Sequence, residues 1–248
     1  MTHRPTLVLV HAFPLSAAMW DDVRAALSDV AEVVTPDLPG FGGRPVLDGE
    51  PSLDALADDL LDHVATLGHD RVVLGGLSLG GYVAMAFLRR HPGRVSALVL
   101  ADTKASADPP AARDNRERIA RAVLEQRSPR LLIDEVLPGL LGQTTRLRRP
   151  AVVGRVRGFM AEADPVGVAW AQRAMAARPD SLDTLRDAHV PALVVVGEED
   201  TLSPVADAEA MARALPDARL VVVPGVGHLS AVEDPRAFAA AVRDFLHS

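Results

Sequence analysis

The chain has 248 residues, enough for one large α/β domain or two small ones, and 48% of the residues are hydrophobic, which supports a sizeable core. The formal net charge of −7 argues against nucleic acid as the main partner, because no basic field covers the protein as a whole. The chain contains no cysteine, which excludes disulfides, thiolate metal sites and cysteine nucleophiles.

The first apolar run, Leu7 to Val10, is too short for the core of a signal peptide. No stretch approaches the roughly 18 apolar residues that a membrane span needs. We therefore expect a cytoplasmic protein without a membrane partner. The sequence leaves the oligomeric state open, a homo-oligomer included.

Up to residue 103 the chain alternates between short apolar runs and segments of helical periodicity. Thr6 to Val10 is apolar without interruption, which is typical of a strand buried on both faces. From Leu53 to Leu67 the apolar residues recur at helical spacing. The predicted strands cover 6–10, 32–35, 72–74 and 95–100, and the predicted helices cover 21–27, 53–67 and 79–90. Such alternation predicts a parallel sheet with helices on both faces.

From Lys104 to about Ala188 the alternation stops, and only helical segments follow one another. These predicted helices cover 111–126, 130–137, 146–160 and 166–177. Strands then return at 191–196 and 219–223, with helices at 204–215 and 235–246. We therefore divide the chain into an α/β core, 1–103 and 189–248, and a helical cap, 104–188, inserted between two strands.

The most informative stretch is Gly76-Leu77-Ser78-Leu79-Gly80, which separates a predicted strand from a predicted helix. The spacing Gly-x-Ser-x-Gly in this context is the signature of a nucleophile elbow. Small residues at 76 and 80 let strand and helix pass closely, and the turn lifts the Ser78 hydroxyl above the sheet edge. The amino end of the helix also favours negative charge beside Ser78.

A serine hydroxyl needs a base within hydrogen-bond reach and a carboxylate that orients this base. Three residues that follow predicted strands supply this set in the order Ser78, Asp200, His228. Ligands of parallel sheets bind beyond the carboxyl ends of the strands, where all three lie. Serine, acid and histidine in this order are typical of the α/β hydrolases.

Five segments together resemble the α/β-hydrolase family, in its branch of esterases and haloperoxidase-like enzymes that also holds enol-lactone hydrolases. They are His11-Ala12-Phe13-Pro14, Asp37-Leu38-Pro39-Gly40-Phe41-Gly42, Gly76-Leu77-Ser78-Leu79-Gly80-Gly81, Gly197-Glu198-Glu199-Asp200 and Gly227-His228. The resemblance implies an α/β-hydrolase fold with a cap. It also implies catalysis by Ser78, Asp200 and His228 without a metal or organic cofactor.

The acid has three competitors: Asp102, Glu198 and Glu199. Asp102 is the main alternative, because hydrolases of this fold sometimes carry the acid after the preceding strand.

The resemblance places the oxyanion hole at the backbone N–H groups of Phe13 and Leu79. The family usually has glycine where this chain has Ala12, and a positive φ at this position would strain the loop. We expect His11 to brace the same loop by hydrogen bonds.

Six large apolar side chains are candidates for the lining of a substrate pocket: Trp20, Phe41, Phe159, Met160, Trp170 and Met175. The cap is also rich in arginine, with Arg113, Arg116, Arg118, Arg121, Arg127, Arg130, Arg146, Arg148, Arg149, Arg155 and Arg157. Solvated helix faces explain most of these residues. A sharper hypothesis is that one arginine points inward and pairs with a substrate carboxylate.

The sequence thus favours a carboxylesterase that acts on small to medium esters through an acyl-enzyme on Ser78. An enol-lactonase or a carbon–carbon bond hydrolase would use the same triad. A ligand receptor on a hydrolase fold is the alternative from another class. The expected partner is a small ester or lactone.

Overall fold

The computed structural model describes residues 4–247 and is built around a six-stranded sheet with the order β2-β1-β3-β4-β5-β6. The strands are β1 (Thr6–Val10), β2 (Glu32–Val34), β3 (Val72–Leu77), β4 (Val95–Ala101), β5 (Ala192–Gly197) and β6 (Ala218–Val223). Every neighbouring pair is parallel, as predicted. β1, β3 and β5 are buried along their whole length, which explains their unbroken apolar sequences.

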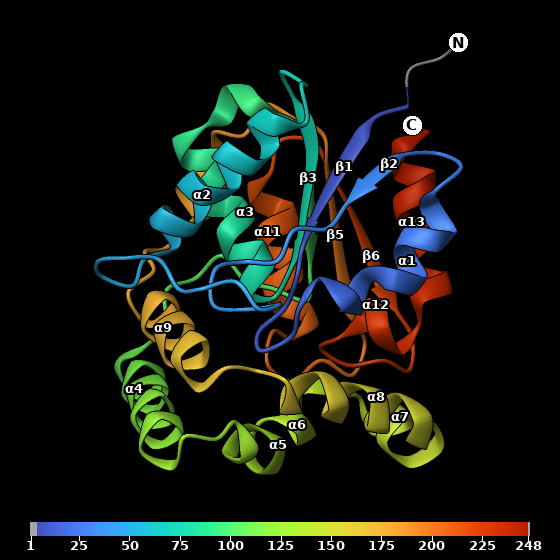
Figure 1. The fold of residues 1–248 in the computed structure, drawn as a ribbon. Coiled ribbons are helices and arrows are strands. Elements are labelled where there is room, and N and C mark those ends of the chain that lie inside the picture. Colours follow the sequence, from blue (N-terminus) through green and yellow to red (C-terminus); the bar gives the residue numbers. More distant parts are fainter. Residues whose placement is uncertain (1–3, 248) are drawn as a thin grey trace.

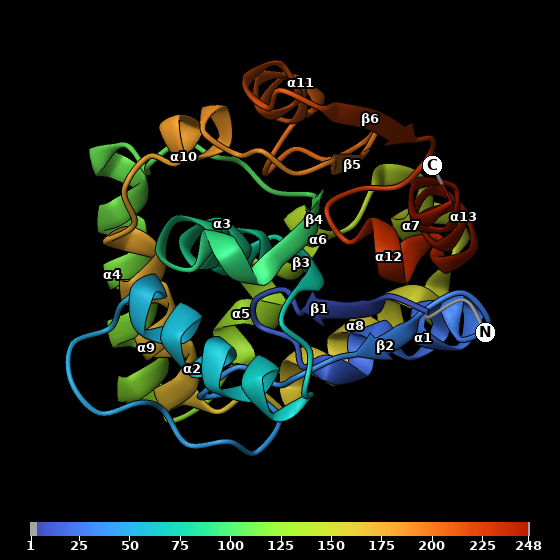
Figure 2. The ribbon, with the colours of Figure 1, turned by 90° about the horizontal axis from the view of Figure 1, so that it is seen from above.

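Helices cover both faces of the sheet (Figure 1). One face carries α2 (Leu53–Thr66), α3 (Leu79–Arg90) and α11 (Val205–Ala214). The other carries α1 (Asp21–Leu27), α12 (Ser230–Glu233) and α13 (Pro235–Leu246). Figure 2 shows the resulting three layers from above. The predicted α/β class and parallel sheet are confirmed. None of the helices in residues 4–247 is long and apolar enough to cross a membrane.

The segment between β4 and β5 consists of helices that gather beyond the carboxyl ends of the strands, where the cap was predicted (Figure 1). These helices are α4 (Pro110–Gln126), α5 (Arg130–Glu135), α6 (Leu137–Leu140), α7 (Gln143–Arg148), α8 (Pro150–Ala161) and α9 (Pro165–Ala176). α4 packs along α9. A further helix, α10 (Leu182–Arg186), leaves this group and packs on α3 and α11.

Several boundaries differ from the prediction. The predicted helix 146–160 is two helices, because Pro150 lacks the N–H that a continuous helix needs and instead opens α8. The helix predicted at 130–137 ends at Glu135, and α6 follows. α10, α12 and a 3-10 helix at Ala17–Trp20 were not predicted. Residues 1–3 and 248, which the predicted core includes, lie outside the described residues.

Candidate active site

Ser78 lies between β3 and α3 in a strained backbone conformation, with φ 55° and ψ −111°. Its neighbours hold it there: its N–H donates to the Ala101 carbonyl at 2.9 Å, and its own carbonyl accepts from Thr103 Oγ1 at 2.9 Å. The helix also approaches β1 closely, because a Cβ on Gly80 would lie 2.1 Å from the Val10 carbonyl oxygen. A larger residue at Gly80 would therefore clash with β1. The hydrogen bonds of the Ser78 backbone maintain its strained conformation.

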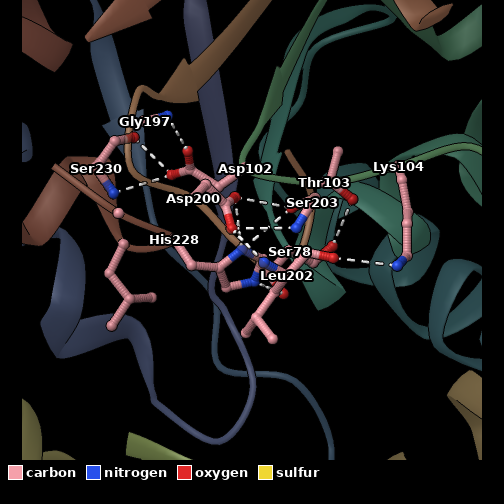
Figure 3. Close-up of polar contacts among 12 residues, drawn as sticks. Ser78, Asp102, Thr103, Lys104, Gly197, Asp200, Leu202, Ser203, His228 and Ser230 are labelled. Atoms are coloured by element: carbon pink, nitrogen blue, oxygen red, sulfur yellow. Dashed lines mark hydrogen bonds and ion pairs between the residues drawn. The ribbon is translucent and has the colours of Figure 1, made fainter. Parts of the chain in front are cut away.

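His228 connects Ser78 to Asp200 (Figure 3). Its Nε2 lies 2.8 Å from Ser78 Oγ, and its Nδ1 lies 2.8 Å from Asp200 Oδ2. Since an ionised carboxylate only accepts, Nδ1 carries the proton and Nε2 is free to accept from the Ser78 hydroxyl. The three side chains follow β3, β5 and β6, and their residues are only 9%, 5% and 4% exposed in the order Ser78, Asp200, His228.

The turn that follows Asp200 supplies hydrogen-bond donors that stabilise its ionised carboxylate. Burial raises the pKa of this carboxyl, but the hydrogen bonds from His228, Ser203 and Leu202 outweigh burial and lower it. The backbone N–H groups of Leu202 and Ser203 donate to Oδ1 at 2.8 and 3.0 Å. The Ser203 hydroxyl donates to Oδ2 at 2.9 Å and lies 3.1 Å from His228 Nδ1. Sequence reasoning missed Ser203, although the spacing Asp-x-x-Ser after a strand is typical of such a side-chain turn.

Asp102, the main competitor for the acid, has different partners. It accepts from the Gly197 N–H at 2.9 Å, and from the N–H and the hydroxyl of Ser230 at 2.9 and 2.6 Å (Figure 3). Burial and the nearby charge of Asp200 raise the pKa of Asp102 well above its ordinary value. It therefore joins β4, β5 and the segment after His228, and makes no hydrogen bond to the imidazole.

The other two competitors are also occupied elsewhere. Glu198 accepts from the Gly225 N–H at 3.1 Å. Glu199 accepts from the N–H and hydroxyl of Thr144, at 2.8 and 2.5 Å, and so joins the core to α7.

Glu233, which sequence reasoning also missed, clamps the loop that carries His228. Its carboxylate accepts from the N–H groups on either side of His228, Gly227 at 2.9 Å and Leu229 at 3.3 Å. A third N–H, that of Gly142 in the cap, donates to it at 3.0 Å. Burial raises the pKa of Glu233. No signal in its local sequence, Val-Glu-Asp-Pro, reveals this role, since its partners depend on tertiary packing.

The N–H groups of Phe13 and Leu79 make no hydrogen bond within residues 4–247. Leu79 opens α3, so its N–H has no partner inside the helix. Within the same residues only Ser78, Asp102 and Arg127 combine a side chain with a positive φ. Ala12 therefore does not need the conformational freedom of glycine.

His11 stabilises the loop after β1 by two hydrogen bonds. Its Nδ1 donates to the Ala12 carbonyl at 3.0 Å, and its Nε2 accepts from the Leu38 N–H at 3.0 Å. Burial lowers the pKa of His11, which keeps the ring neutral and able to serve both partners. The loop after β1 is thus tied to the loop after β2.

A cavity of about 320 Å³ opens on Ser78 and His228 beneath the cap. Its wall is formed by Phe13, by residues of α4, α5, α6 and α9, and by Tyr82, Lys104, Asp108 and Leu202. Its volume is at the lower end of the range of small-molecule sites. Of the six apolar residues predicted to line a pocket, only Met175 lies in this wall.

The other five predicted lining residues lie elsewhere. Trp20 is fully buried in the core against Phe238, with ring centroids 5.7 Å apart. Phe41 and Phe159 line a second cavity between the loop after β2 and the cap. Met160 on α8 and Trp170 on α9 are buried and line neither cavity. Aromatic character predicted burial for these residues, but it did not predict the side on which each would be buried.

The strained serine after β3, the acid after β5, the histidine after β6 and the helices that lie over the site define a protein of the hydrolase class among α/β folds. The sequence pattern of the alpha/beta hydrolase family matches residues 7–241, and the chain belongs to this family.

Similarity to two esterases indicates that this chain is an esterase-type member of the family. A pimeloyl-[acyl-carrier protein] methyl ester esterase from Aromatoleum aromaticum is 31% identical, over 98% of each chain. The structure of a thermophilic esterase from Thermogutta terrifontis, with malate bound, is 42% identical at a TM-score of 0.94, over 98% of this chain and 91% of that one. The enol-lactonase of Burkholderia xenovorans LB400 is 30% identical at a TM-score of 0.90, over 99% and 92%.

Proposed function

We propose that the protein hydrolyses carboxylic esters of small to medium substrates through an acyl-enzyme on Ser78. The observation that carries this proposal is the continuous hydrogen-bonded chain from Ser78 Oγ through His228 to Asp200, at the wall of a cavity. A buried serine with a base at 2.8 Å is arranged for nucleophilic attack.

In the first step the Ser78 oxygen attacks the ester carbonyl as its proton passes to His228 Nε2. Asp200 stabilises the imidazolium that forms, because its carboxylate accepts from Nδ1. The negative charge on the carbonyl oxygen is stabilised by the N–H groups of Phe13 and Leu79, which have no other partner in the described chain. Collapse of this intermediate breaks the ester C–O bond, His228 protonates the leaving alcohol, and an acyl-Ser78 remains.

In the second step water attacks the acyl-Ser78 carbonyl and gives a proton to His228 Nε2. The intermediate collapses, the carboxylic acid leaves, and the proton returns to the Ser78 oxygen. The same steps open a lactone ring, with the alcohol still attached to the acid. The likeness to an enol-lactonase at 30% identity supports such lactones as a second candidate substrate. The likeness to a methyl ester esterase at 31% identity supports simple alkyl esters.

The test is the hydrolysis of p-nitrophenyl esters from acetate to decanoate by the wild type and by Ser78→Ala. We expect turnover by the wild type with an optimum at short to medium chains, and loss of at least about three orders of magnitude in the variant. The circular dichroism spectra of both proteins establish that the variant is folded. Equal activity of the two proteins, or no activity of the wild type on any ester, contradicts the proposal.

A further inference from the structure

The cavity beside Ser78 has a polar wall in the cap that the proposed mechanism does not use. Arg116 on α4 lies in this wall, and its side chain is only 20% exposed. Its Nε donates to Asp108, and its Nη1 donates to Gln172 Oε1 at 3.0 Å. Its Nη2 donates to no group in residues 4–247. Arg116 is therefore held in one orientation with donor capacity to spare.

Asp108 does not neutralise this wall, because it is shared between two arginines. Arg178 is only 3% exposed and donates to Asp108 Oδ1 at 2.7 Å. Burial raises the pKa of the Asp108 carboxyl, but the hydrogen bonds from Arg178 and Arg116 outweigh burial and lower it. One carboxylate against two guanidinium groups leaves a net positive charge. A partly buried excess charge is costly unless an anion compensates for it.

The remaining polar groups of the wall are also mainly donors. Since Gln172 Oε1 accepts from Arg116, its amide NH₂ is directed away from that bond. Tyr82 also lines the cavity, and its hydroxyl has no hydrogen bond within the described chain. Lys104 Nζ uses one of its three donors on the Leu202 carbonyl, at 3.1 Å (Figure 3).

The carboxylates in the cavity wall do not reverse its charge. Besides Asp108, the lining includes only one other carboxylate, Glu135, and this one is paired with Arg118. Arg116 and Lys104 thus remain as cations facing a space that also contains Ser78 and His228. A ligand that fits this wall brings a negative group with several acceptors, and its reactive carbonyl reaches Ser78.

We propose that the substrate of this site is a carboxylated ester, whose free carboxylate is bound by Arg116 and Lys104 while its ester carbonyl lies at Ser78. The inference rests on the proposed ester hydrolysis and names its substrate class. The carboxylate accepts from Arg116 Nη2 and from Lys104 Nζ. Gln172 and Tyr82 offer further donors. Of the arginines in the cap, Arg116 is the one that the structure assigns to substrate recognition.

The experiment compares substrates that differ only in charge. Mono-p-nitrophenyl adipate and p-nitrophenyl 6-methylheptanoate have the same length and branching, with a carboxylate replaced by an isopropyl group. A second pair, 3-carboxyphenyl acetate and 3-isopropylphenyl acetate, places the charge on the alcohol side. We expect kcat/KM of the wild type to favour the carboxylated member of at least one pair by about 10-fold or more, as charge-assisted hydrogen bonds imply.

Arg116→Gln and Lys104→Met should each lower this preference about 10-fold, since each removes one cation but keeps most of the side-chain length. The matched control is Arg113→Gln, an exposed arginine on the same helix outside the cavity wall, which should keep the wild-type preference. Arg116→Lys should restore part of it. Thermal unfolding of each variant shows whether loss of the Asp108 contact has disturbed the cap.

Binding separates this inference from the proposed reaction. Calorimetry on Ser78→Ala with monomethyl adipate and with methyl 6-methylheptanoate needs no turnover, and we expect the carboxylated ester alone to bind measurably. Loss of that binding in the double variant with Arg116→Gln supports the inference even where an ester series shows no turnover. Equal kcat/KM within both pairs overturns it while leaving ester hydrolysis intact. Equal binding of the two methyl esters, or carboxylate binding that is independent of Arg116, also overturns it.

Discussion

Asp102 and Asp200 follow neighbouring strands and are both buried, yet only Asp200 forms a hydrogen bond with His228, at 2.8 Å. Asp102 is instead bonded to Gly197 and Ser230. This difference decides which carboxylate can fix the imidazole tautomer. Proximity to a strand end, which both residues share, could not decide it.

The first prediction concerns these two acids. Asp200→Asn should lower kcat by about three to four orders of magnitude, because an amide can donate to Nδ1 and so favours the wrong tautomer. Asp102→Asn should lower kcat by less than about 10-fold, because its partners belong to the scaffold. Steady-state kinetics on one p-nitrophenyl ester measures both effects. An equal loss in the two variants would show that Asp102 shares the role of the acid.

The second prediction concerns Ser203, whose hydroxyl lies between Asp200 and His228. Ser203→Ala removes one of four hydrogen bonds to the Asp200 carboxylate and leaves the bond to His228 in place. We expect kcat to fall about 3- to 10-fold with KM unchanged, in line with about 1 kcal/mol for one hydrogen bond.

A suitable control for Ser203→Ala is Ser106→Ala, since the Ser106 hydroxyl makes no hydrogen bond within residues 4–247 and only its backbone carbonyl accepts, from Arg178. This control should retain wild-type kcat. A rise in KM without a change in kcat for Ser203→Ala would mean that the hydroxyl serves substrate binding and not the orientation of the acid.

The fold could be predicted from the sequence wherever a local pattern decides the structure. Short apolar runs predicted all six strands within a few residues. The runs of β1, β3 and β5 contain no charged residue because these strands are buried along their whole length, whereas the edge strands β2 and β6 are partly exposed and include Glu32 and Arg219. The break at Pro150 was missed because the flanking residues keep helical periodicity across it. β3 extends to Leu77, beyond its predicted end, because Gly75 and Gly76 look like turn residues but pair with Leu9 and Val10.

The residues of the candidate site also fall into those that local sequence motifs predicted and those that depend on tertiary packing. Ser78, Asp200 and His228 lie in motifs with fixed positions relative to strands, and the structure brings their side chains together. Glu233 and the wall around Arg116 depend on which segments of the cap fold over the core. No local pattern contains this information. The aromatic residues were poor guides to the cavity for the same reason, as Trp20 shows by packing on Phe238 at the other end of the chain.

The third prediction concerns the close approach of α3 to β1. A Cβ on Gly80 would lie 2.1 Å from the Val10 carbonyl oxygen and 3.0 Å from that of His11, and both are backbone atoms that cannot move aside. Gly80→Ala should therefore lower the free energy of unfolding by at least about 3 kcal/mol or prevent folding. Urea denaturation measures the change.

Gly158→Ala is the matched control for Gly80→Ala. Gly158 lies within α8, and nothing is within 4 Å of a Cβ added there. Because alanine is the better helix former, we expect this variant to be more stable by about 0.5 to 1 kcal/mol. If the two substitutions changed stability alike, steric contact at the elbow would not be the cause.

The fourth prediction concerns the pH dependence of stability. Burial and the charge of Asp200 raise the pKa of Asp102 above its value in the unfolded chain, so the folded state holds this proton to higher pH. Above about pH 4 the folded state then binds more protons than the unfolded state, and the free energy of unfolding falls as pH rises. Asp102→Asn cannot titrate and lacks this contribution.

Urea denaturation of the wild type and Asp102→Asn at pH 5 and pH 8 tests the sign of this effect. The free energy of unfolding of the wild type, relative to that of the variant, should be greater at pH 5 than at pH 8. Only the wild type has a carboxyl at position 102, and the stabilisation from its raised pKa is lost as this carboxyl ionises in the folded state. Asp48→Asn, at an exposed loop position, controls for the loss of one carboxylate. An advantage of the wild type that grows toward pH 8 would mean that Asp102 is ionised in the fold and that its three donors outweigh its burial.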